Sequence, residues 1–202
     1  MKKARLLPRK KPLQKRSTQL VDDILRGAIR VLKKQGGRRF TTIRVAEEAG
    51  ISVGSLYQYF PNKESILFQV QQQEWQATSG MLLKMIADAR FAPPKRLGRA
   101  IEAFFETERM EADLRKALAE TGISLEQTEE FQRLRAVIFT QMAQFLAQLR
   151  PALSASKRRF LAEFIFTVMG SLAEEVTTRI HSQSEVKKWA AHCADMILSF
   201  VG

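Results

Sequence analysis

The most informative part of the chain spans residues 40–67 and reads FTTIRVAEEAGISVGSLYQYFPNKESIL. A pair of threonines opens a short helical segment that Gly50 closes, and Ser52 is placed to cap a second short segment that ends at Pro61. Glycine at position 50 supplies the backbone freedom that a tight turn requires. Two short helices joined by a turn of about three residues predict a helix-turn-helix.

The second short helix, residues 53–59, carries small and hydroxyl-bearing side chains on its N-terminal side. Small side chains allow a backbone to approach a duplex, hydroxyls reach phosphates and base edges, and an apolar methyl can contact thymine. The N-terminus of a helix also favours phosphate. Ile51 and Leu56 are left to anchor the two helices to their neighbours. This segment therefore predicts a DNA-recognition helix.

Helical spacing of apolar residues continues through most of the chain. Glycine and proline are scarce, at ten and six residues, and no alternating apolar and polar pattern persists. The fold is therefore predicted to be all-α. The expected helices cover about residues 18–36, 41–49, 53–59, 63–89, 95–121, 125–150, 154–182 and 184–201.

The net charge of +12 lies entirely in the first 63 residues. Residues 1–16 hold eight Lys or Arg, no acid and two prolines, which predicts a disordered basic arm. Residues 17–63 are the predicted DNA-binding domain and remain basic, whereas residues 64–202 are neutral. A cationic N-terminal part on a neutral body predicts a polyanionic partner for that part alone.

Three interpretations of the basic arm remain open. It could enter the minor groove or follow phosphates, as other N-terminal arms do, and this is the interpretation that we favour. It could be a solubilising or vector-derived stretch. It could also contact a membrane surface, although it lacks the interleaved Leu, Trp and Phe of an interfacial helix.

Other classes of protein fit the sequence less well. No apolar run approaches the roughly 20 residues of a membrane span, and no hydrophobic segment of a secretory signal follows the basic start. A single cysteine, Cys193, favours a reducing cytoplasm. Neither a nucleotide-binding loop nor a G-x-S-x-G motif occurs. A helix break between His181 and Glu185 argues against a metal site there. We expect no enzyme activity, catalytic residue, metal or cofactor.

The helix-turn-helix segment resembles the DNA-binding domain of TetR/AcrR-family transcriptional repressors over about residues 17–70. The family hallmark resembles T-x-x-x-I-A-x-x-A-G-V-S-x-G-x-L-Y-x-Y-F-x-x-K-E. Val45 and Ile51 replace similar aliphatic residues and leave the packing intact. The matching residues are Thr41, Val45, Ala46, Ala49, Gly50, Ile51, Ser52, Gly54, Leu56, Tyr57, Tyr59, Phe60, Lys63 and Glu64.

The resemblance implies a three-helix DNA-binding domain followed by a helical domain, residues 64–202, for effector binding and dimerisation. It also implies a sequence-specific transcriptional regulator that acts as a homodimer on double-stranded DNA. Repression is the usual mode of the family, so we expect a repressor that an effector releases from a palindromic operator. The apolar candidate residues of the neutral body favour a small apolar effector, aromatic or acyl. A ligand-independent or an activating DNA-binding regulator is the alternative. A non-specific architectural DNA binder and a membrane-associated helical adaptor are the rival classes.

The resemblance assigns DNA contacts residue by residue. Val53, Ser55 and Gln58 are the best candidates for discriminating bases. Ile43 stands where some relatives carry a base-reading arginine. Tyr57 is expected at the phosphates rather than in the core, whereas Phe60 is expected to be buried. The full set of expected DNA-binding residues is Thr42, Arg44, Ser52, Val53, Gly54, Ser55, Tyr57, Gln58, Tyr59 and Lys63.

Two further sets of residues follow from the family expectation for the neutral body. Apolar residues at helical spacing usually belong to the hydrophobic core, so each candidate could have a purely structural role instead of the functional one. The expected effector-binding residues are Trp75, Phe104, Phe105, Phe139, Met142, Phe166 and Met169. The expected dimer-interface residues are Leu161, Ile165, Val168, Leu172, Trp189, Met196, Ile197 and Phe200.

Overall fold

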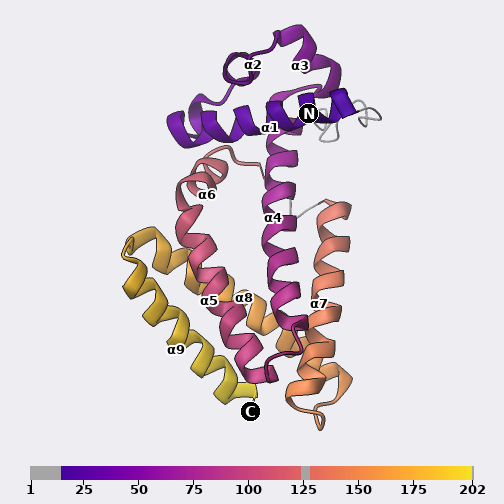
Figure 1. Ribbon diagram of the computed structural model, residues 1–202, viewed down its shortest axis with the longest axis vertical. Coiled ribbons are helices and arrows are strands. Elements are labelled where there is room, and N and C mark those ends of the chain that lie inside the picture. Colours follow the sequence, from indigo (N-terminus) through magenta and orange to yellow (C-terminus); the bar gives the residue numbers. More distant parts are fainter. Residues whose placement is uncertain (1–14, 124–127, 202) are drawn as a thin grey trace. The chain divides into compact units, whose positions relative to one another are not determined.

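The computed structural model describes residues 15–123 and 128–201, and over these residues it consists of α-helices and one 3-10 helix, without a strand. The predicted all-α fold is confirmed (Figure 1). No helix of the described part is long and apolar enough to cross a bilayer. The elements are α1 (Lys15–Gln35), η1 (Gly37–Arg39), α2 (Thr42–Ala49), α3 (Val53–Tyr59), α4 (Lys63–Ala87), α5 (Pro93–Met110), α6 (Ala112–Ala119), α7 (Glu129–Leu149), α8 (Ala155–Arg179) and α9 (Gln183–Val201).

The ends of α2 and α3 are made by the residues that the sequence indicates. The Thr41 hydroxyl accepts a hydrogen bond from the Arg44 backbone N–H at 3.3 Å. The Ser52 hydroxyl accepts one from the Ser55 backbone N–H at 3.0 Å. Gly50 ends α2 with φ 68°, a left-handed conformation that glycine adopts at little cost. Capping therefore fixes both short helices locally.

One predicted helix is wrong. The expected continuous helix over residues 95–121 is two helices, α5 and α6, separated by Glu111. The backbone of Glu111 leaves the helical region, with φ −107° and ψ 12°. Neither glycine nor proline marks this position, so the sequence gives no local signal for the break. The break is explained by tertiary packing, because Leu114 and Leu118 of α6 are buried in a different core from that of α5.

The described residues form two compact units. Unit 1 contains residues 15–75 together with 113–123, and unit 2 contains residues 76–112 together with 128–201. The predicted boundary at residue 63 therefore differs from the division in the structure, because the first half of α4 and all but the first residue of α6 belong to unit 1. Of the predicted basic arm, residues 1–14 lie outside the described residues, and α1 begins at Lys15.

Unit 1 is built on the apolar face of α1. Leu56 of α3 and Phe60, the residue that follows the end of α3, are both fully buried. This confirms the core position expected for Phe60. Helices α1 and α2 cross closely at Gly27, where an added Cβ would lie 3.1 Å from the Ala49 Cβ. Because Gly27 has no side chain, the backbones of α1 and α2 can approach each other. Helix α3 packs on α2, so this close crossing also helps to position α3.

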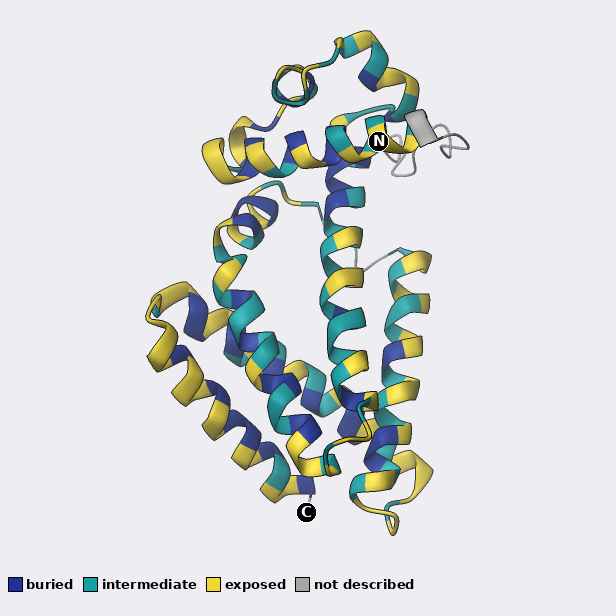
Figure 2. Ribbon diagram, viewed as in Figure 1, coloured by how far each residue is buried: buried dark blue, intermediate teal, exposed yellow. Residues whose placement is uncertain are grey.

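Unit 2 has α5 packed on α8 and α9, and α7 packed on α8 (Figure 1). Buried side chains line the inner faces of these helices, and α9 shows a mostly exposed outer side in Figure 2. Arg96 of α5 is buried and donates hydrogen bonds to the Ile86 carbonyl and to the Gln148 side-chain oxygen, each at 2.8 Å. These acceptors lie in the last turns of α4 and α7, so Arg96 holds the ends of three helices together.

Candidate nucleic-acid interface

The first turn of α2 and the middle of α3 meet through two hydroxyl groups. The Thr42 Oγ1 and Tyr57 Oη atoms lie 3.0 Å apart in a hydrogen bond. The Tyr57 side chain remains 39% exposed, which places it at the surface rather than in the core. The pair therefore presents two polar groups from different helices at one point of the surface, an arrangement suited to one phosphate.

The exposed side of α3 has the composition expected of a recognition helix. Ser52, Gly54 and Gln58 are exposed, and a Cβ added at Gly54 would meet no atom closer than 3.8 Å. The Ser52 and Ser55 hydroxyls lie 2.8 Å apart at the start of the helix. Because the surface is free of bulky side chains here, the α3 backbone is open to close approach.

All of the predicted DNA-binding residues lie on α2, on α3 with its cap, or at the start of α4, and none is buried. Val53, Tyr59 and Arg44 are partly exposed, and Lys63 is exposed. Ile43, on the first turn of α2, is a large apolar residue with 56% exposure. The predicted DNA-binding residues thus lie together on three consecutive helices of unit 1. Their contacts with DNA stay a prediction.

Arg44 is held in place by the turn that precedes α2. Its Nη1 atom donates a hydrogen bond of 2.8 Å to the Arg39 backbone carbonyl. The side chains of Arg38 and Arg39 are exposed to solvent. The guanidinium of Arg44 is therefore oriented before any ligand arrives, and pre-orientation reduces the entropy cost of binding.

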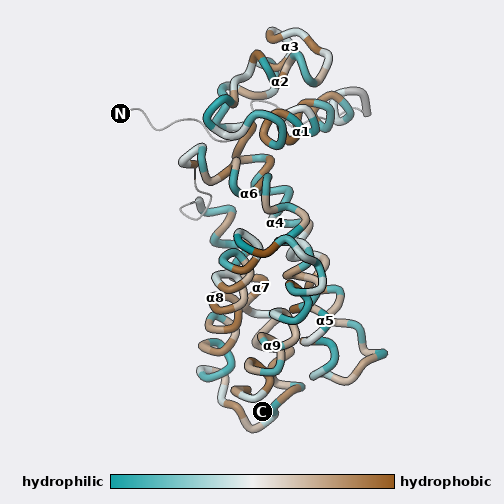
Figure 3. Tube along the Cα trace, turned by 90° about the vertical axis from the view of Figure 1, so that its left-hand side faces the viewer, coloured by the Kyte–Doolittle hydropathy of each residue, from teal (hydrophilic) through white to brown (hydrophobic). Residues whose placement is uncertain are grey.

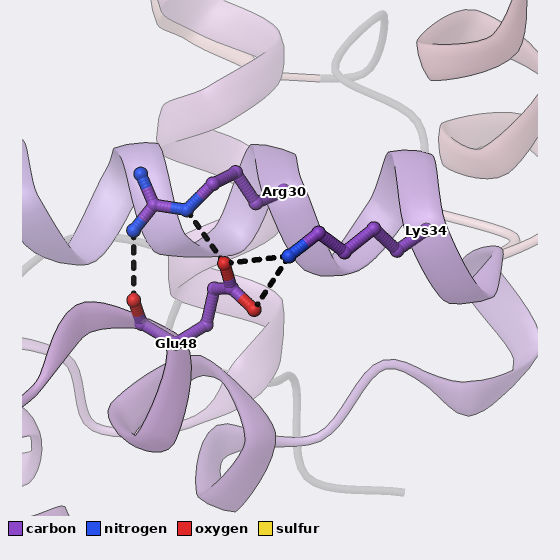
Figure 4. Close-up of polar contacts among 3 residues, drawn as sticks. All are labelled: Arg30, Lys34 and Glu48. Atoms are coloured by element: carbon purple, nitrogen blue, oxygen red, sulfur yellow. Dashed lines mark hydrogen bonds and ion pairs between the residues drawn. The ribbon is translucent and has the colours of Figure 1, made fainter.

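A cluster of three charged side chains fixes α2 against α1 (Figure 4). Arg30 donates to a Glu48 carboxylate oxygen at 2.8 Å and to the Glu48 backbone carbonyl at 2.7 Å. Lys34 donates to the same carboxylate at 3.0 and 3.3 Å. The hydrogen bond from Lys34, followed by that from Arg30, lowers the pKa of Glu48 below its usual value. The carboxylate thus stays ionised and joins the two helices.

Sequence reasoning missed three supports of this interface, namely Gly27, the Arg30–Glu48–Lys34 cluster and a contact from Glu120 to the turn before α2. A glycine within an otherwise helical apolar segment could have indicated the close crossing at Gly27. No local signal pairs Glu48 with α1, because these partners are 14 and 18 residues apart. The Glu120 contact spans 83 residues and depends on the tertiary fold.

The arrangement of unit 1 defines a helix-turn-helix DNA-binding protein. The sequence model described as bacterial regulatory proteins of the tetR family matches residues 24–70. A second one, described as a tetracyclin repressor-like C-terminal domain, matches residues 93–200 and so covers more than half of the chain. The chain belongs to the TetR family of transcriptional regulators.

Solved structures share this fold at low sequence identity. A putative TetR-family transcriptional regulator from Mesorhizobium loti has a TM-score of 0.71 and 15% identity, covering 93% of this chain and 98% of its own. The fatty acid degradation regulator FadR from Bacillus halodurans has a TM-score of 0.68 and 16% identity, covering 94% and 97%. SmeT, the repressor of the Stenotrophomonas maltophilia multidrug efflux pump SmeDEF, has a TM-score of 0.66 and 19% identity, covering 89% of each chain. No curated protein matches the chain in sequence.

The predicted effector-binding residues fall into different environments. Trp75 belongs to unit 1, whereas the other six belong to unit 2. Phe105 and Met169 are buried in the core of unit 2, and Phe104 and Met142 pack against that core. The remaining two, Phe139 on α7 and Phe166 on α8, form an edge-to-face pair with ring centroids 5.4 Å apart.

The structure narrows the predicted dimer interface. Leu161, Ile165 and Ile197 are each 1% exposed in the core of unit 2, so they have no surface to offer a partner. Val168 and Leu172 are partly exposed. Trp189, Met196 and Phe200 are 40%, 49% and 54% exposed on α9, and they remain candidates for the interface.

The described residues contain no group of three or more His, Cys, Asp or Glu side chains placed to hold a metal ion. His181 and Glu185 are both exposed, on either side of the start of α9. Cys193 is buried, and this burial raises the pKa of its thiol. The family and the fold are those of transcriptional regulators rather than of enzymes.

Proposed function

We propose that the protein is a repressor that binds a palindromic operator as a homodimer and is released by a small apolar effector. The observation that carries the proposal is the open, hydroxyl-rich surface of α3, with Tyr57 exposed and hydrogen-bonded to Thr42. Hydroxyl donors on a helix with small neighbours fit phosphates and base edges in a major groove. Val53, Ser55 and Gln58 are the residues that we assign to base discrimination.

An aromatic row on α8 and α9 supports a homodimer. Phe160 and Phe164 are stacked with ring centroids 6.1 Å apart, and Phe164 lies 5.0 Å from Phe200. Phe160 and Phe200 are each 54% exposed, and hydrophobic segments run along both helices in Figure 3. Exposed aromatic side chains in a contiguous row are typical of an interface. Two copies would place two recognition helices on half-sites about 34–36 Å apart.

The effector that we propose is apolar, either aromatic or acyl. Unit 2 contributes partly buried aromatic and methionine side chains, including Phe104, Met142 and the Phe139–Phe166 pair. A solved structure of SmeT, at a TM-score of 0.63 and 18% identity, is a complex with triclosan. FadR from Bacillus halodurans is described as a fatty acid degradation regulator. Both descriptions are compatible with an apolar effector for this chain.

The proposed regulation is a shift between two conformations. An effector that binds one conformation more tightly moves the equilibrium toward it, and DNA affinity falls if the recognition helices no longer match successive grooves. Helix α4 belongs to unit 1 up to Trp75 and to unit 2 from Gln76. A continuous helix shared by both units is the element through which we expect this coupling.

A salt-titrated binding assay tests the DNA-binding part of the proposal. A duplex selected by the purified protein from a randomised pool is compared with a scrambled duplex of equal length. Much tighter binding to the selected duplex, and a palindrome in its sequence, are expected. Equal affinity for both duplexes would indicate a non-specific binder, and no binding at low salt would overturn the proposal.

A promoter-reporter assay tests the sense of regulation. The selected site is placed over a promoter, and expression is measured with and without the protein. Repression that triclosan-like or acyl compounds relieve supports the proposal. Increased expression would identify an activator, and repression unaffected by any such compound would identify a ligand-independent regulator.

A further inference from the structure

The turn that connects α1 to α2 is held by a segment far away in sequence. The Gly37 backbone N–H donates a hydrogen bond of 3.1 Å to the Glu120 carboxylate, which lies directly after α6. Gly37 is buried, and a Cβ added there would collide with the Ala117 carbonyl oxygen of α6. The end of α6 thus rests directly on the backbone of η1, and all of these residues belong to unit 1.

The same turn is fixed on its other side by α2. The Arg39 carbonyl accepts the 2.8 Å hydrogen bond from Arg44 Nη1, and Phe40 is only 2% exposed. Residues 37–40 are therefore anchored at both ends, by Glu120 and Ala117 at one end and by Phe40 and Arg44 at the other. Displacement of Gly37 would move the carbonyl that orients the Arg44 guanidinium.

We infer that Glu120 is a positioning residue for DNA binding, acting through the Gly37–Arg39 turn on Arg44. This inference rests on the proposed function, because it assumes that Arg44 contacts a phosphate. The Arg44 side chain makes no other hydrogen bond or ion pair within the described part of the chain, so its remaining donors are available for an anion. Glu120 fixes where those donors point.

The sign of the effect separates positioning from simple electrostatics. Glu120 is an exposed acid, so its charge alone opposes DNA binding, and its removal would then strengthen binding. Positioning has the opposite consequence, because removal of the carboxylate releases the turn and weakens binding. Variants that separate the charge of Glu120 from its hydrogen bond therefore decide between the two.

The experiment measures affinity for the selected duplex across a salt series for four single variants. Glu120→Ala removes both the charge and the hydrogen bond. Glu120→Gln keeps an acceptor for Gly37 but removes the charge, and Glu120→Asp keeps the charge but shortens the reach. Asp113→Ala is the control for charge, because Asp113 is an exposed acid on α6, the helix that precedes Glu120, and has no ion pair among the described residues.

Positioning predicts that Glu120→Ala and Glu120→Asp bind about 3- to 10-fold more weakly, whereas Glu120→Gln stays within about twofold of the wild type. The salt slope of Glu120→Ala falls by about one, as expected when one phosphate is no longer neutralised. Asp113→Ala binds at least as tightly as the wild type. Equal or tighter binding by both Ala and Asp variants at position 120 would overturn the inference.

A double-mutant cycle with Arg44→Ala identifies the route of the effect. If Glu120 acts through Arg44, the double variant Arg44→Ala, Glu120→Ala binds as weakly as Arg44→Ala alone. Additive reductions in affinity would show that Glu120 acts elsewhere and would overturn the inference. Thermal melts accompany each variant, and if Glu120→Ala is poorly folded, the comparison of Asp with Gln at this position carries the test.

The failure of this inference and the failure of the proposed function are distinguishable. A wild-type protein that selects no duplex refutes the proposed function, and the inference with it. A wild-type protein that binds its duplex, with a Tyr57→Ala variant that binds weakly and a Glu120→Ala variant that does not, refutes the inference alone.

Discussion

Tyr57 shows at the scale of one residue how position on a short helix separates surface from core. Tyr57 is 39% exposed, whereas Leu56 and Phe60 on either side of it are fully buried. Successive residues on a helix differ by about 100° in direction, so neighbours in sequence face different surroundings. The ring of Tyr57 lies at the edge of the core, and its hydroxyl reaches Thr42.

Substitution of Tyr57 tests its assignment to DNA. Tyr57→Phe removes only the hydroxyl, and we expect affinity for the selected duplex to fall by about tenfold, because one phosphate hydrogen bond is removed. The melting temperature should fall only slightly, since the exposed hydrogen bond to Thr42 is removed as well. Tyr57→Ala should weaken binding at least as much while the dimer persists. Phe60→Ala is the contrasting variant, since removing a fully buried ring costs about 3–5 kcal/mol of stability. A Tyr57→Ala protein that unfolds like Phe60→Ala would show that Tyr57 is part of the core.

The contact between α1 and α2 is the decisive feature at the scale of elements. Gly27 allows the helices to approach, and Glu48 then joins α2 to Arg30 and Lys34 of α1. Lys34 and Arg30 lower the pKa of Glu48, so its stabilising contribution is complete above the pKa of the unfolded chain, near 4.5, and is lost as the pH falls through the lower folded value. The cluster is on the surface, so its effect is modest and sensitive to salt.

Glu48→Gln tests this element-scale contact through its pH dependence. At neutral pH and low salt we expect a melting temperature lower by about 1–3 °C, because the ion pairs are removed. The difference from the wild type should narrow as the pH is lowered from about 4.5 toward the lower pKa of the folded state, because Glu48 takes up a proton first in the unfolded chain. Glu47→Gln, at an exposed acid on the same helix, is the control. A difference that stays constant from pH 7 to about pH 3 would contradict the assigned role.

At the same scale, the boundaries of α2 and α3 could be predicted because their caps are local. The capping hydrogen bonds of Thr41, Gly50 and Ser52 reach residues no more than four positions away. The identity of these three residues is therefore sufficient to predict where the helices begin and end. The break at Glu111 could not be predicted, because it serves the burial of Leu114 and Leu118 in unit 1. Tertiary packing therefore overrode a helical pattern that looked continuous.

Self-association is the first question at the scale of the whole molecule. Because Phe200 is 54% exposed, Phe200→Glu should leave the fold of the protomer intact and turn the proposed dimer into a monomer. The mass measured by sedimentation should fall to that of one protomer. The affinity for a palindromic duplex should fall with it, by about tenfold or more. Val137→Glu is the matched control, because Val137 is exposed to a similar extent (50%) but lies on α7, and this variant should remain dimeric. A Phe200→Glu protein that stays dimeric would place the interface elsewhere.

The predicted contribution of the basic N-terminal residues to DNA binding belongs to the scale of the complex. Deleting residues 1–14 removes six Lys or Arg side chains and no acid. We expect weaker binding to all duplexes and a smaller dependence of affinity on salt, by about one unit of slope for each phosphate that these side chains neutralise, with the selected site unchanged. Binding isotherms at several salt concentrations and a repeated site selection measure both effects. A changed site preference would show that these residues read bases.

The sequence by itself determined the all-α class, the helix-turn-helix and the small, hydroxyl-bearing side of α3, because capping, turn formation and helical periodicity act between residues a few positions apart. The full set of DNA-binding residues from Thr42 to Lys63 was expected from the resemblance to the TetR/AcrR family. Burial of Phe60 followed from the same periodicity, whereas exposure of Tyr57 was expected from the resemblance to the TetR/AcrR family. Only the tertiary structure decided that α6 joins unit 1, that Glu120 reaches Gly37 and that Ile197 lies inside the protomer. These features depend on contacts between segments far apart in the chain. No local sequence pattern specifies whether the apolar face of a helix packs into the core of unit 1 or into that of unit 2.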